Sequence, residues 1–288
     1  CPGVLIYNRE AAKEVFGADD PDTVQAKVSD WATFNATAAE MKEAGYKMTA
    51  TTNDTFRTYS NNVTTPWVVD GKIQIDDNLK AWVDASKEMA DNGYCGTQGL
   101  WSDDWSKGFY PEGKVFCYFG PAWLVNFSMA ADTEGSIGYN GGWGAAQGPQ
   151  GFFWGGTWLL ANKDTQKKEA VKDILEWITL DSSEEGLQYM WANGTYNGEG
   201  GTKDCVASGT VMSKSDGSVD FLGGQNMFDV FVPANSYAKG TNLTQYDETI
   251  NTYWREQVRE YTAGNKSREQ AIADFKQQVA DNLDVIVE

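Results

Sequence analysis

The sequence predicts an α/β protein, because segments with helical periodicity alternate with short apolar segments that suit buried strands. The clearest strand is residues 115–119, VFCYF, a wholly apolar run of β-branched and aromatic residues. Gly120 and Pro121 end this strand, because proline lacks the N–H that a strand ladder needs. Trp123 follows at its carboxyl end, and a second segment, residues 153–162 (FWGGTWLLAN), also places tryptophans beside glycines. Open α/β sheets bind ligands at the carboxyl ends of strands, so these segments indicate a cleft lined by aromatic rings.

The other elements follow from apolar runs, capping residues and helical periodicity. Two further apolar runs predict strands at residues 1–7 and 137–143. Capping side chains precede several helical patterns, and glycines end several of them, so we expect helices at residues 9–16 (cap Asn8, stop Gly17), 31–44 (cap Asp30, stop Gly45), 78–92 (cap Asp77, stop Gly93), 103–107, 167–179, 183–193 (capping box Ser182 and Glu185), 247–263 and 268–283 (cap Ser267).

The helix expected at residues 167–179 is amphipathic. Its apolar residues fall at helical spacing, and we expect this stripe to face a protein core: Val171, Ile174, Leu175 and Ile178. Residues 199–218 are rich in glycine and serine and predict a loop.

Composition excludes several classes of function. The 288 residues suffice for one large or two medium domains, and the net charge of −18 argues against a nucleic-acid partner, which would reward clustered Lys and Arg. The chain has no histidine, which removes Ser-His-Asp and Cys-His catalysis and histidine zinc sites. The 12 tryptophans are more than a core of this size requires, so we expect some of these rings at a pocket surface.

The four cysteines are Cys1, Cys95, Cys117 and Cys205, and none of them forms a CxxC motif. A thiolate metal site is therefore not expected. An even number suits disulfides in an oxidising compartment, with Cys95 and Cys117 as the favoured pair. The alternative is that Cys117 is simply a small buried apolar residue of its strand.

The order of motifs resembles the extracellular solute-binding proteins of bacterial ABC importers, in the maltose-binding-protein-like, carbohydrate-binding branch. Five segments carry the resemblance along nearly the whole chain: residues 4–9 (VLIYNR), 30–34 (DWATF), 112–123 (EGKVFCYFGPAW), 155–158 (GGTW) with the helix behind it, and 267–271 (SREQA). Each motif alone is weak, and their shared order and spacing carry the identification.

The resemblance implies a two-lobe, periplasmic-binding-protein-like (type II) fold. Residues 1–154 would form the main part of the second lobe, 155–224 a remnant of the first lobe, and 225–288 helices that return to the second lobe. In the family the Tyr-Asn segment comes well inside the mature protein, so the N-terminal part of the first lobe is expected to be missing. Cys1 matches a lipid-anchoring cysteine poorly, because an apolar run rather than a polar tether follows it.

The resemblance also implies the function: capture of a sugar or oligosaccharide and delivery to an ABC permease, by a monomeric surface lipoprotein or periplasmic protein with no cofactor. Sugars present C–H faces to aromatic rings and hydroxyls to polar groups. Trp123 corresponds to a stacking ring of the family, and Tyr246, Asp54 and Phe56 lie near other family contacts. The predicted ligand-binding residues are Trp123, Tyr246, Trp158, Gly155, Gly156, Asp54, Phe56 and Tyr59.

Three alternatives stay open from the sequence. A carbohydrate-active enzyme could use Asp103 and Asp104, although adjacent residues at a helix start point in different directions, and capping explains them better. A surface adhesion module would expose an apolar patch, and a solute-binding protein could take a non-sugar ligand. A calcium site built from scattered carboxylates is also open.

Overall fold

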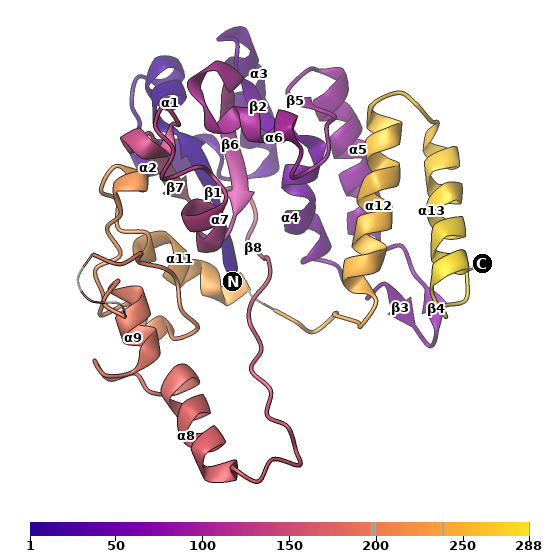
Figure 1. Cartoon of the computed structure of the whole chain (residues 1–288). Coiled ribbons are helices and arrows are strands. Elements are labelled where there is room, and N and C mark those ends of the chain that lie inside the picture. Colours follow the sequence, from indigo (N-terminus) through magenta and orange to yellow (C-terminus); the bar gives the residue numbers. More distant parts are fainter. Residues whose placement is uncertain (197, 199, 238, 288) are drawn as a thin grey trace.

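The computed structural model describes residues 1–196, 198, 200–237 and 239–287. Its centre is a mixed sheet with the strand order β5-β2-β6-β1-β7, to which β8 adds by pairing with β1 (Figure 1). The strands are β1 (Pro2–Asn8), β2 (Lys47–Thr51), β5 (Cys95–Gly96), β6 (Val115–Gly120), β7 (Trp143–Ala146) and β8 (Phe152–Phe153). Strand β2 runs parallel to β5 and β6, whereas β1 runs antiparallel to β6, β7 and β8.

The sheet is covered on both faces, and β1 shows why. All of its residues are buried, and alternate side chains enter different cores. Leu5 and Tyr7 join the core beneath α1 (Arg9–Phe16), α2 (Pro21–Lys27) and α3 (Trp31–Glu43). Val4 and Ile6 join the opposite core, which also contains residues of α6 (Asp103–Ser106), α7 (Ala122–Phe127), α9 (Leu187–Ala192), α10 (Gly209–Met212) and α11 (Phe228–Ala234).

A helical unit flanks the sheet. It contains α4 (Phe56–Ser60), α5 (Asp77–Asp91), α12 (Asp247–Thr262), α13 (Arg268–Asn282) and a small ribbon of β3 (Val68–Val69) and β4 (Lys72–Ile73). Its core is built around Trp82, Trp254 and Phe275, which are at most 1% exposed. Figure 1 shows α12 and α13 side by side, in line with their contacts in this core. We call the sheet, its covering helices and this helical unit the main body.

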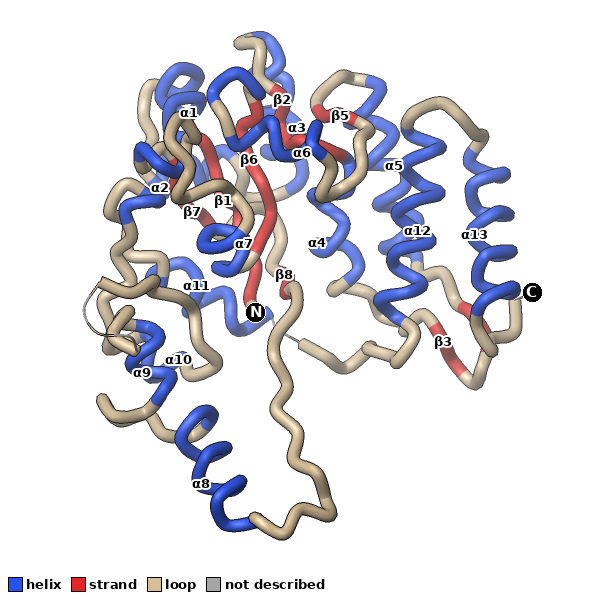
Figure 2. The backbone as a smooth tube through the Cα atoms, viewed as in Figure 1, coloured by secondary structure: helices blue, strands red, loops and turns tan. Residues whose placement is uncertain are grey.

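Residues 157–185, which we call the arm, differ from the main body. An extended segment leads to α8 (Lys168–Thr179), and Figure 2 shows both projecting away from the sheet. No residue from 157 to 185 is buried. Trp158, Leu160 and Leu180 are 90%, 91% and 74% exposed. Immediately after the arm, α9 returns to the main body, because Ala192 lies in the core of the sheet.

Several local predictions are confirmed. Asn8 and Asp30 cap α1 and α3, and Ser267 caps α13. Strands β1 and β6 and helices α8, α12 and α13 lie where the sequence predicts them. The cap of α5 is Asp76 rather than Asp77.

Other local predictions are wrong. The helix expected at 183–193 begins only at Leu187, and Gly138–Asn140 is a 3-10 turn ahead of β7 rather than part of a strand over 137–143. The second apolar segment, residues 153–162, was also expected to contain a strand, but only its first residue, Phe153, is paired, because the following residues meet no described strand. The apolar stripe of α8 is also not in a core: α8 has no buried residue.

The predicted disulfide between Cys95 and Cys117 is wrong. All four cysteines are free. Cys95 on β5 and Cys117 on β6 both pair with Thr49 of β2, from opposite sides. Two strand spacings separate them by about 9.5 Å, whereas disulfides join Cα atoms less than about 7 Å apart. Cys117 is instead a buried residue whose thiol donates to the Met48 carbonyl oxygen at 3.2 Å.

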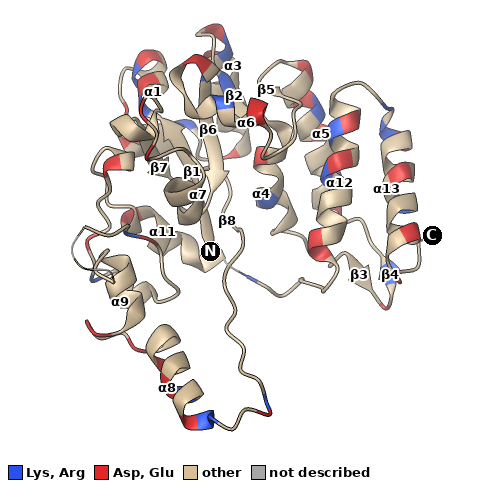
Figure 3. Ribbon diagram, in the orientation of Figure 1, with Lys and Arg blue, Asp and Glu red and all other residues tan. Residues whose placement is uncertain are grey.

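Two further observations concern the described residues as a set. None of their helices combines the length and apolar character needed to cross a membrane. Acidic residues are spread over many elements, including α8, α12 and α13 (Figure 3), and no group of carboxylates and thiols within the described part of the chain could hold a metal ion.

Candidate ligand-binding site

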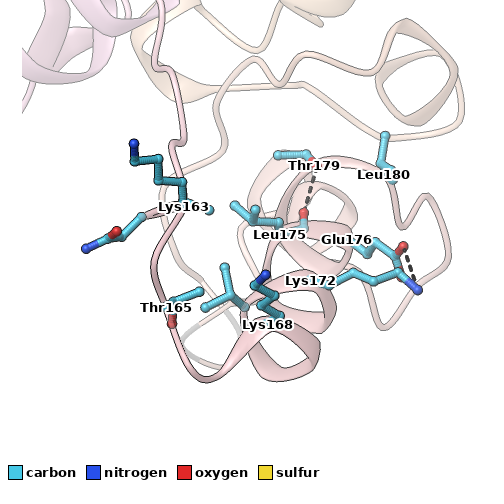
Figure 4. Close-up of a pocket in the computed structure, with 11 residues that line it drawn as sticks. Lys163, Thr165, Lys168, Lys172, Leu175, Glu176, Thr179 and Leu180 are labelled. Carbon is cyan, nitrogen blue, oxygen red and sulfur yellow. Dashed lines mark hydrogen bonds and ion pairs between the residues drawn. The ribbon is translucent and has the colours of Figure 1, made fainter.

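A hollow of about 360 Å³ lies beneath the extended part of the arm, but it has few features of a built site. Figure 4 shows it between residues 161–165 and α8. Leu175 and Leu180 contribute apolar surface, and Lys163, Lys168 and Lys172 stand around it. It contains no aromatic ring. This hollow is the uncovered apolar side of α8 rather than a preformed pocket.

A hollow of about 530 Å³, the tryptophan pocket, lies where the sheet meets the start of the arm. Strand β6 ends at Gly120, and Pro121 directs the chain into α7, so that Trp123 is the second residue of that helix. The walls of the tryptophan pocket come from the start of β1, from α7, from the start of the arm and from residues on and after α9. The lining residues are Cys1, Pro2, Ala122, Trp123, Phe127, Gly155, Gly156, Thr157, Trp191, Asp204 and Cys205.

The ring of Trp123 is held in place by two other tryptophans. Trp101 stacks on it at 6.1 Å with an interplanar angle of 27°, and Trp154 meets it edge to face at 5.0 Å. The Trp123 Nε1–H also donates to the Trp154 carbonyl oxygen at 3.2 Å. Trp101 itself is 52% exposed. Because the Trp123 ring is fixed and partly exposed, it can stack on an apolar ligand face with little loss of side-chain entropy.

Main-chain groups form the wall beside these rings. Gly155 and Gly156 have φ angles of 76° and 138°, a region that side-chain-bearing residues rarely adopt. Both residues are exposed. The paired glycines therefore let a ligand approach main-chain N–H and C=O groups closely.

Asp204 supplies a carboxylate to the same pocket. It is 8% exposed, and its Oδ1 accepts from the Cys205 N–H at 2.7 Å. Burial raises the pKa of Asp204, while hydrogen bonds from the Cys205 main chain and from the Asn126 and Trp191 side chains oppose that shift. A buried acceptor fixed in this way suits the hydroxyl groups of a ligand.

A smaller hollow, the Arg57 pocket, lies across the two glycines and measures about 280 Å³. Gly155 and Gly156 line both pockets, and Trp158 lines this one. Arg57 donates to both carboxylate oxygens of Glu248, at 3.0 and 2.9 Å, and its guanidinium lies 5.4 Å from the centre of the Trp154 ring. The hydrogen bonds from Arg57 hold the pKa of Glu248 below its usual value.

The fold and these pockets can be compared with known proteins. The sequence model described as "Bacterial extracellular solute-binding protein" matches residues 1–216. The chain belongs to this family. No curated protein matches it.

Solved structures show the same fold. An extracellular solute-binding protein of family 1 has a TM-score of 0.76 at 17% identity, over 97% of this chain and 70% of that one. The galacto-N-biose-/lacto-N-biose I-binding protein of an ABC transporter from Bifidobacterium longum, in complex with lacto-N-biose, has a TM-score of 0.65 at 17% identity, over 100% and 70%. The sugar-binding protein MalE from Xanthomonas citri has a TM-score of 0.66 at 16% identity, over 97% and 68%. The predicted periplasmic-binding-protein-like, type II α/β fold is confirmed.

Four of the predicted ligand-binding residues of this solute-binding protein lie together. Trp123 is in the tryptophan pocket, Trp158 is in the Arg57 pocket, and Gly155 and Gly156 lie between them. All four follow the ends of short strands, as the sequence pattern indicates.

The other four predicted residues line neither pocket. Phe56 is 1% exposed and packs edge to face on Trp82, while Tyr59 stacks on Trp31 at 5.0 Å. Tyr246 packs against the same core as Phe56, at the start of α12.

The Asp54 carboxylate binds neighbouring residues of the fold rather than facing a pocket. Its carboxylate accepts from the Trp105 Nε1–H and from the Thr51 N–H, both at 2.8 Å. Burial raises the pKa of Asp54 to about 7 despite these hydrogen bonds. Asp54 thus fixes Trp105, which packs edge to face against Trp101 at 4.9 Å, and it reaches the aromatic cluster only indirectly.

Several residues that line the tryptophan pocket or hold its Trp123 ring were not predicted from the sequence. Trp154 stood beside the glycine pair and could have been chosen with Trp158. Asp204 lies in a Gly- and Ser-rich stretch with no periodicity, and Trp101 and Trp191 show no local sign of exposure. Only the fold brings these residues beside Trp123.

Proposed function

We propose that this protein is the sugar-binding component of an ABC importer and that the tryptophan pocket holds a sugar ring against Trp123. The observation that carries the proposal is the fixed Trp123 ring beside exposed glycine main chain and the buried Asp204 carboxylate. These three features suit a pyranose, because the ring stacks on its apolar face while main-chain groups and a carboxylate hydrogen-bond its hydroxyls. Family membership and the sugar-binding proteins that share the fold support it.

Each group has a part in the proposed binding. Trp123 stacks on the C–H face of the sugar, and its contacts with Trp101 and Trp154 keep the ring from turning. Asp204 accepts from hydroxyls at the ring edge. Gly155 and Gly156 offer main-chain groups to the same ligand, and Trp158 extends the aromatic surface toward the Arg57 pocket.

The proposed mechanism is closure of two lobes around the sugar. The main body would form one lobe, and the arm, within the predicted 155–224 segment, would belong to the other, so that Gly155 and Gly156 lie at the crossing. Ligand contacts made to both lobes only in the closed state would favour that state. An ABC permease would then recognise the closed monomer outside the cell, with the protein lipid-anchored or periplasmic.

The two aspartates considered for the enzyme alternative do not form a pair of catalytic acids. Asp103 and Asp104 are exposed residues in the first turn of α6, which Ser102 caps, and Asp104 forms an ion pair with Lys107. The family consists of binding proteins. We therefore propose a non-enzymatic role.

Thermal unfolding with a panel of mono- and oligosaccharides tests the class of ligand, with amino acids and peptides as the comparison panel. A specific ligand at a hundred times its Kd adds about 2.7 kcal/mol to the free energy of unfolding. The proposal predicts that a sugar raises the midpoint and is recovered unchanged. A response to peptides alone would contradict sugar binding, and consumption of the sugar would contradict the non-enzymatic role.

A further inference from the structure

The tryptophan pocket contains two of the four free cysteines. Cys1 and Cys205 both line it, and Cys1 is exposed while Cys205 is half-buried. We propose that Cys1 and Cys205 form a disulfide bond across the wall of this pocket under oxidising conditions. This inference requires no ligand, and it stands or falls separately from the proposed function.

The main chain fixes both cysteines beside the pocket. The Cys1 carbonyl oxygen accepts from the Trp154 N–H at 2.9 Å, and the next residue, Pro2, pairs with Phe153 of β8. On the other side, the Lys203 carbonyl oxygen accepts from Asn126 Nδ2 at 3.0 Å, and the Cys205 main-chain N–H donates to Asp204 Oδ1 at 2.7 Å. The two thiols therefore belong to anchored segments rather than to free ends.

The shared pocket brings the two residues near each other, and the electrostatic coupling between them agrees with this. Burial raises the pKa of the Cys205 thiol, the Asp204 carboxylate adds to this, and the Cys1 amino group opposes it. In return, Cys205 opposes the burial that lowers the pKa of the Cys1 amino group. The charges of Cys1 and Cys205 therefore interact with each other.

The remaining cysteines provide an internal control. Cys95 and Cys117 lie on opposite sides of β2 and cannot reach each other, as described above. Both are buried, and burial raises the pKa of the Cys95 thiol to about 12 and that of Cys117 well above its usual value. A small disulfide in solution cannot reach these two buried thiols, whereas Cys1 is exposed, so Cys95 and Cys117 are expected to stay reduced in the folded protein.

The chemistry balances with a small disulfide, such as cystine, as the oxidant. The exposed Cys1 thiolate attacks a sulfur of cystine, forms a mixed disulfide and releases one cysteine. The Cys205 thiolate then attacks the Cys1 sulfur, forms the protein disulfide and releases the second cysteine. One cystine is reduced to two cysteines while the two protein thiols are oxidised and lose two hydrogen atoms.

The bond would have a structural consequence for the pocket. It would join the start of β1 to the segment that carries Asp204, and so close a loop containing most of the chain. Long closed loops restrict the unfolded state most, so reduction is expected to lower the thermal midpoint. The link would also hold the Asp204 wall at its present place beside Trp123.

Peptide mapping of the full chain tests the proposal. The folded protein is equilibrated with cystine and cysteine, alkylated, and digested with trypsin without reduction. The expected product is peptide 1–9 linked to peptide 204–214, lighter than the two separate peptides by two hydrogens and released by reduction. Cys95 and Cys117 should become alkylated only after unfolding. Recovery of the two peptides unlinked, each alkylated or each capped by cysteine, would overturn the proposal, as would a Cys1–Cys1 dimer.

Matched variants separate the bond from general effects. Cys205→Ser should abolish the linked peptide, whereas Cys117→Ala should retain it. Reduction should lower the thermal midpoint of the oxidised wild-type chain by several degrees and leave that of Cys205→Ser unchanged. An equal shift in both proteins would contradict a bond between Cys1 and Cys205.

Discussion

Helices α12 and α8 have similar sequence patterns and opposite environments. In α12, Ile250, Trp254 and Val258 are buried in a core shared with α13. In α8, Val171, Ile174 and Leu175 also recur at helical spacing, yet no residue of the helix is buried. An amphipathic pattern therefore predicts a helix and its apolar side, but it does not identify what covers that side.

Two apolar extended segments also differ in their environments. Strand β6 lies between β2 and β1, and all of its residues are buried. Residues 157–162 are similarly apolar and extended, but they pair with no described strand and are exposed throughout. Contiguous exposed apolar surface of this kind is typical of an interaction surface. The comparison agrees with the proposal that the arm and the main body belong to different lobes.

The largest effect should come from matched tryptophan truncations in the two regions. Trp254→Ala removes a ring that is 1% exposed and packs on Trp67 and Phe275. Such truncations lower the free energy of unfolding by about 3–5 kcal/mol. Trp177→Ala removes an arm ring that is 41% exposed, and should cost less than about 1 kcal/mol. Urea denaturation measures both, and equal losses would show that the arm is packed in solution.

Buried carboxylates sharpen the comparison, because the main body contains several, including Asp54, and the arm contains none. The pKa of Asp54 is raised to about 7 in the folded protein, so the folded state binds a proton more tightly than the unfolded state. The free energy of unfolding should therefore fall as the pH rises from about 4 to about 7, by at most about 1.4 kcal/mol per pH unit. Asp54→Asn should remove this slope, as measured by denaturation at several pH values. A slope unchanged in Asp54→Asn would contradict the assignment.

A smaller effect concerns ion pairs in the two regions. Glu248→Gln leaves the buried Arg57 without its carboxylate and should cost about 1 kcal/mol, a figure reduced because the Glu248 side chain is 76% exposed. The pKa of Glu248 is lowered, so its contribution is present near neutral pH and is lost as the pH falls through that lowered value. In the arm, Glu176→Gln breaks the exposed pair with Lys172 and should have no measurable effect. If the two variants lost the same free energy of unfolding, the ion pairs of the main body and of the arm would not differ as expected.

The predictions from sequence succeeded where the signal is local. Asn8, Asp30 and Ser267 mark helix starts, because a cap needs only its own helix. Strand β2 and its pairing were not predicted, since Lys47–Thr51 is short and mixed in polarity and gains its place from β5 and β6. The disulfide prediction failed for the same reason, because strand order decides which cysteines meet.

Some residues of the candidate site could also be predicted from local sequence, and others could not. Trp123, Gly155 and Gly156 follow strand ends and could be predicted from the sequence. Asp204 could not, because it reaches the pocket through the packing of residues after α9. Asp54 lies close in space to Trp105, which is 51 residues further along the chain, and its carboxylate is used by Trp105 and Thr51 rather than by the pocket.

The most direct measurement is calorimetric titration of the sugar that stabilises the protein into the wild-type chain, Trp123→Ala and Trp177→Ala. Both variants lose one tryptophan, but only Trp123 lines the tryptophan pocket. We expect Trp123→Ala to weaken binding by at least about tenfold, which corresponds to about 1.4 kcal/mol of lost stacking, and Trp177→Ala to bind like the wild type. An unchanged Kd for Trp123→Ala would contradict the central claim that this pocket holds the sugar.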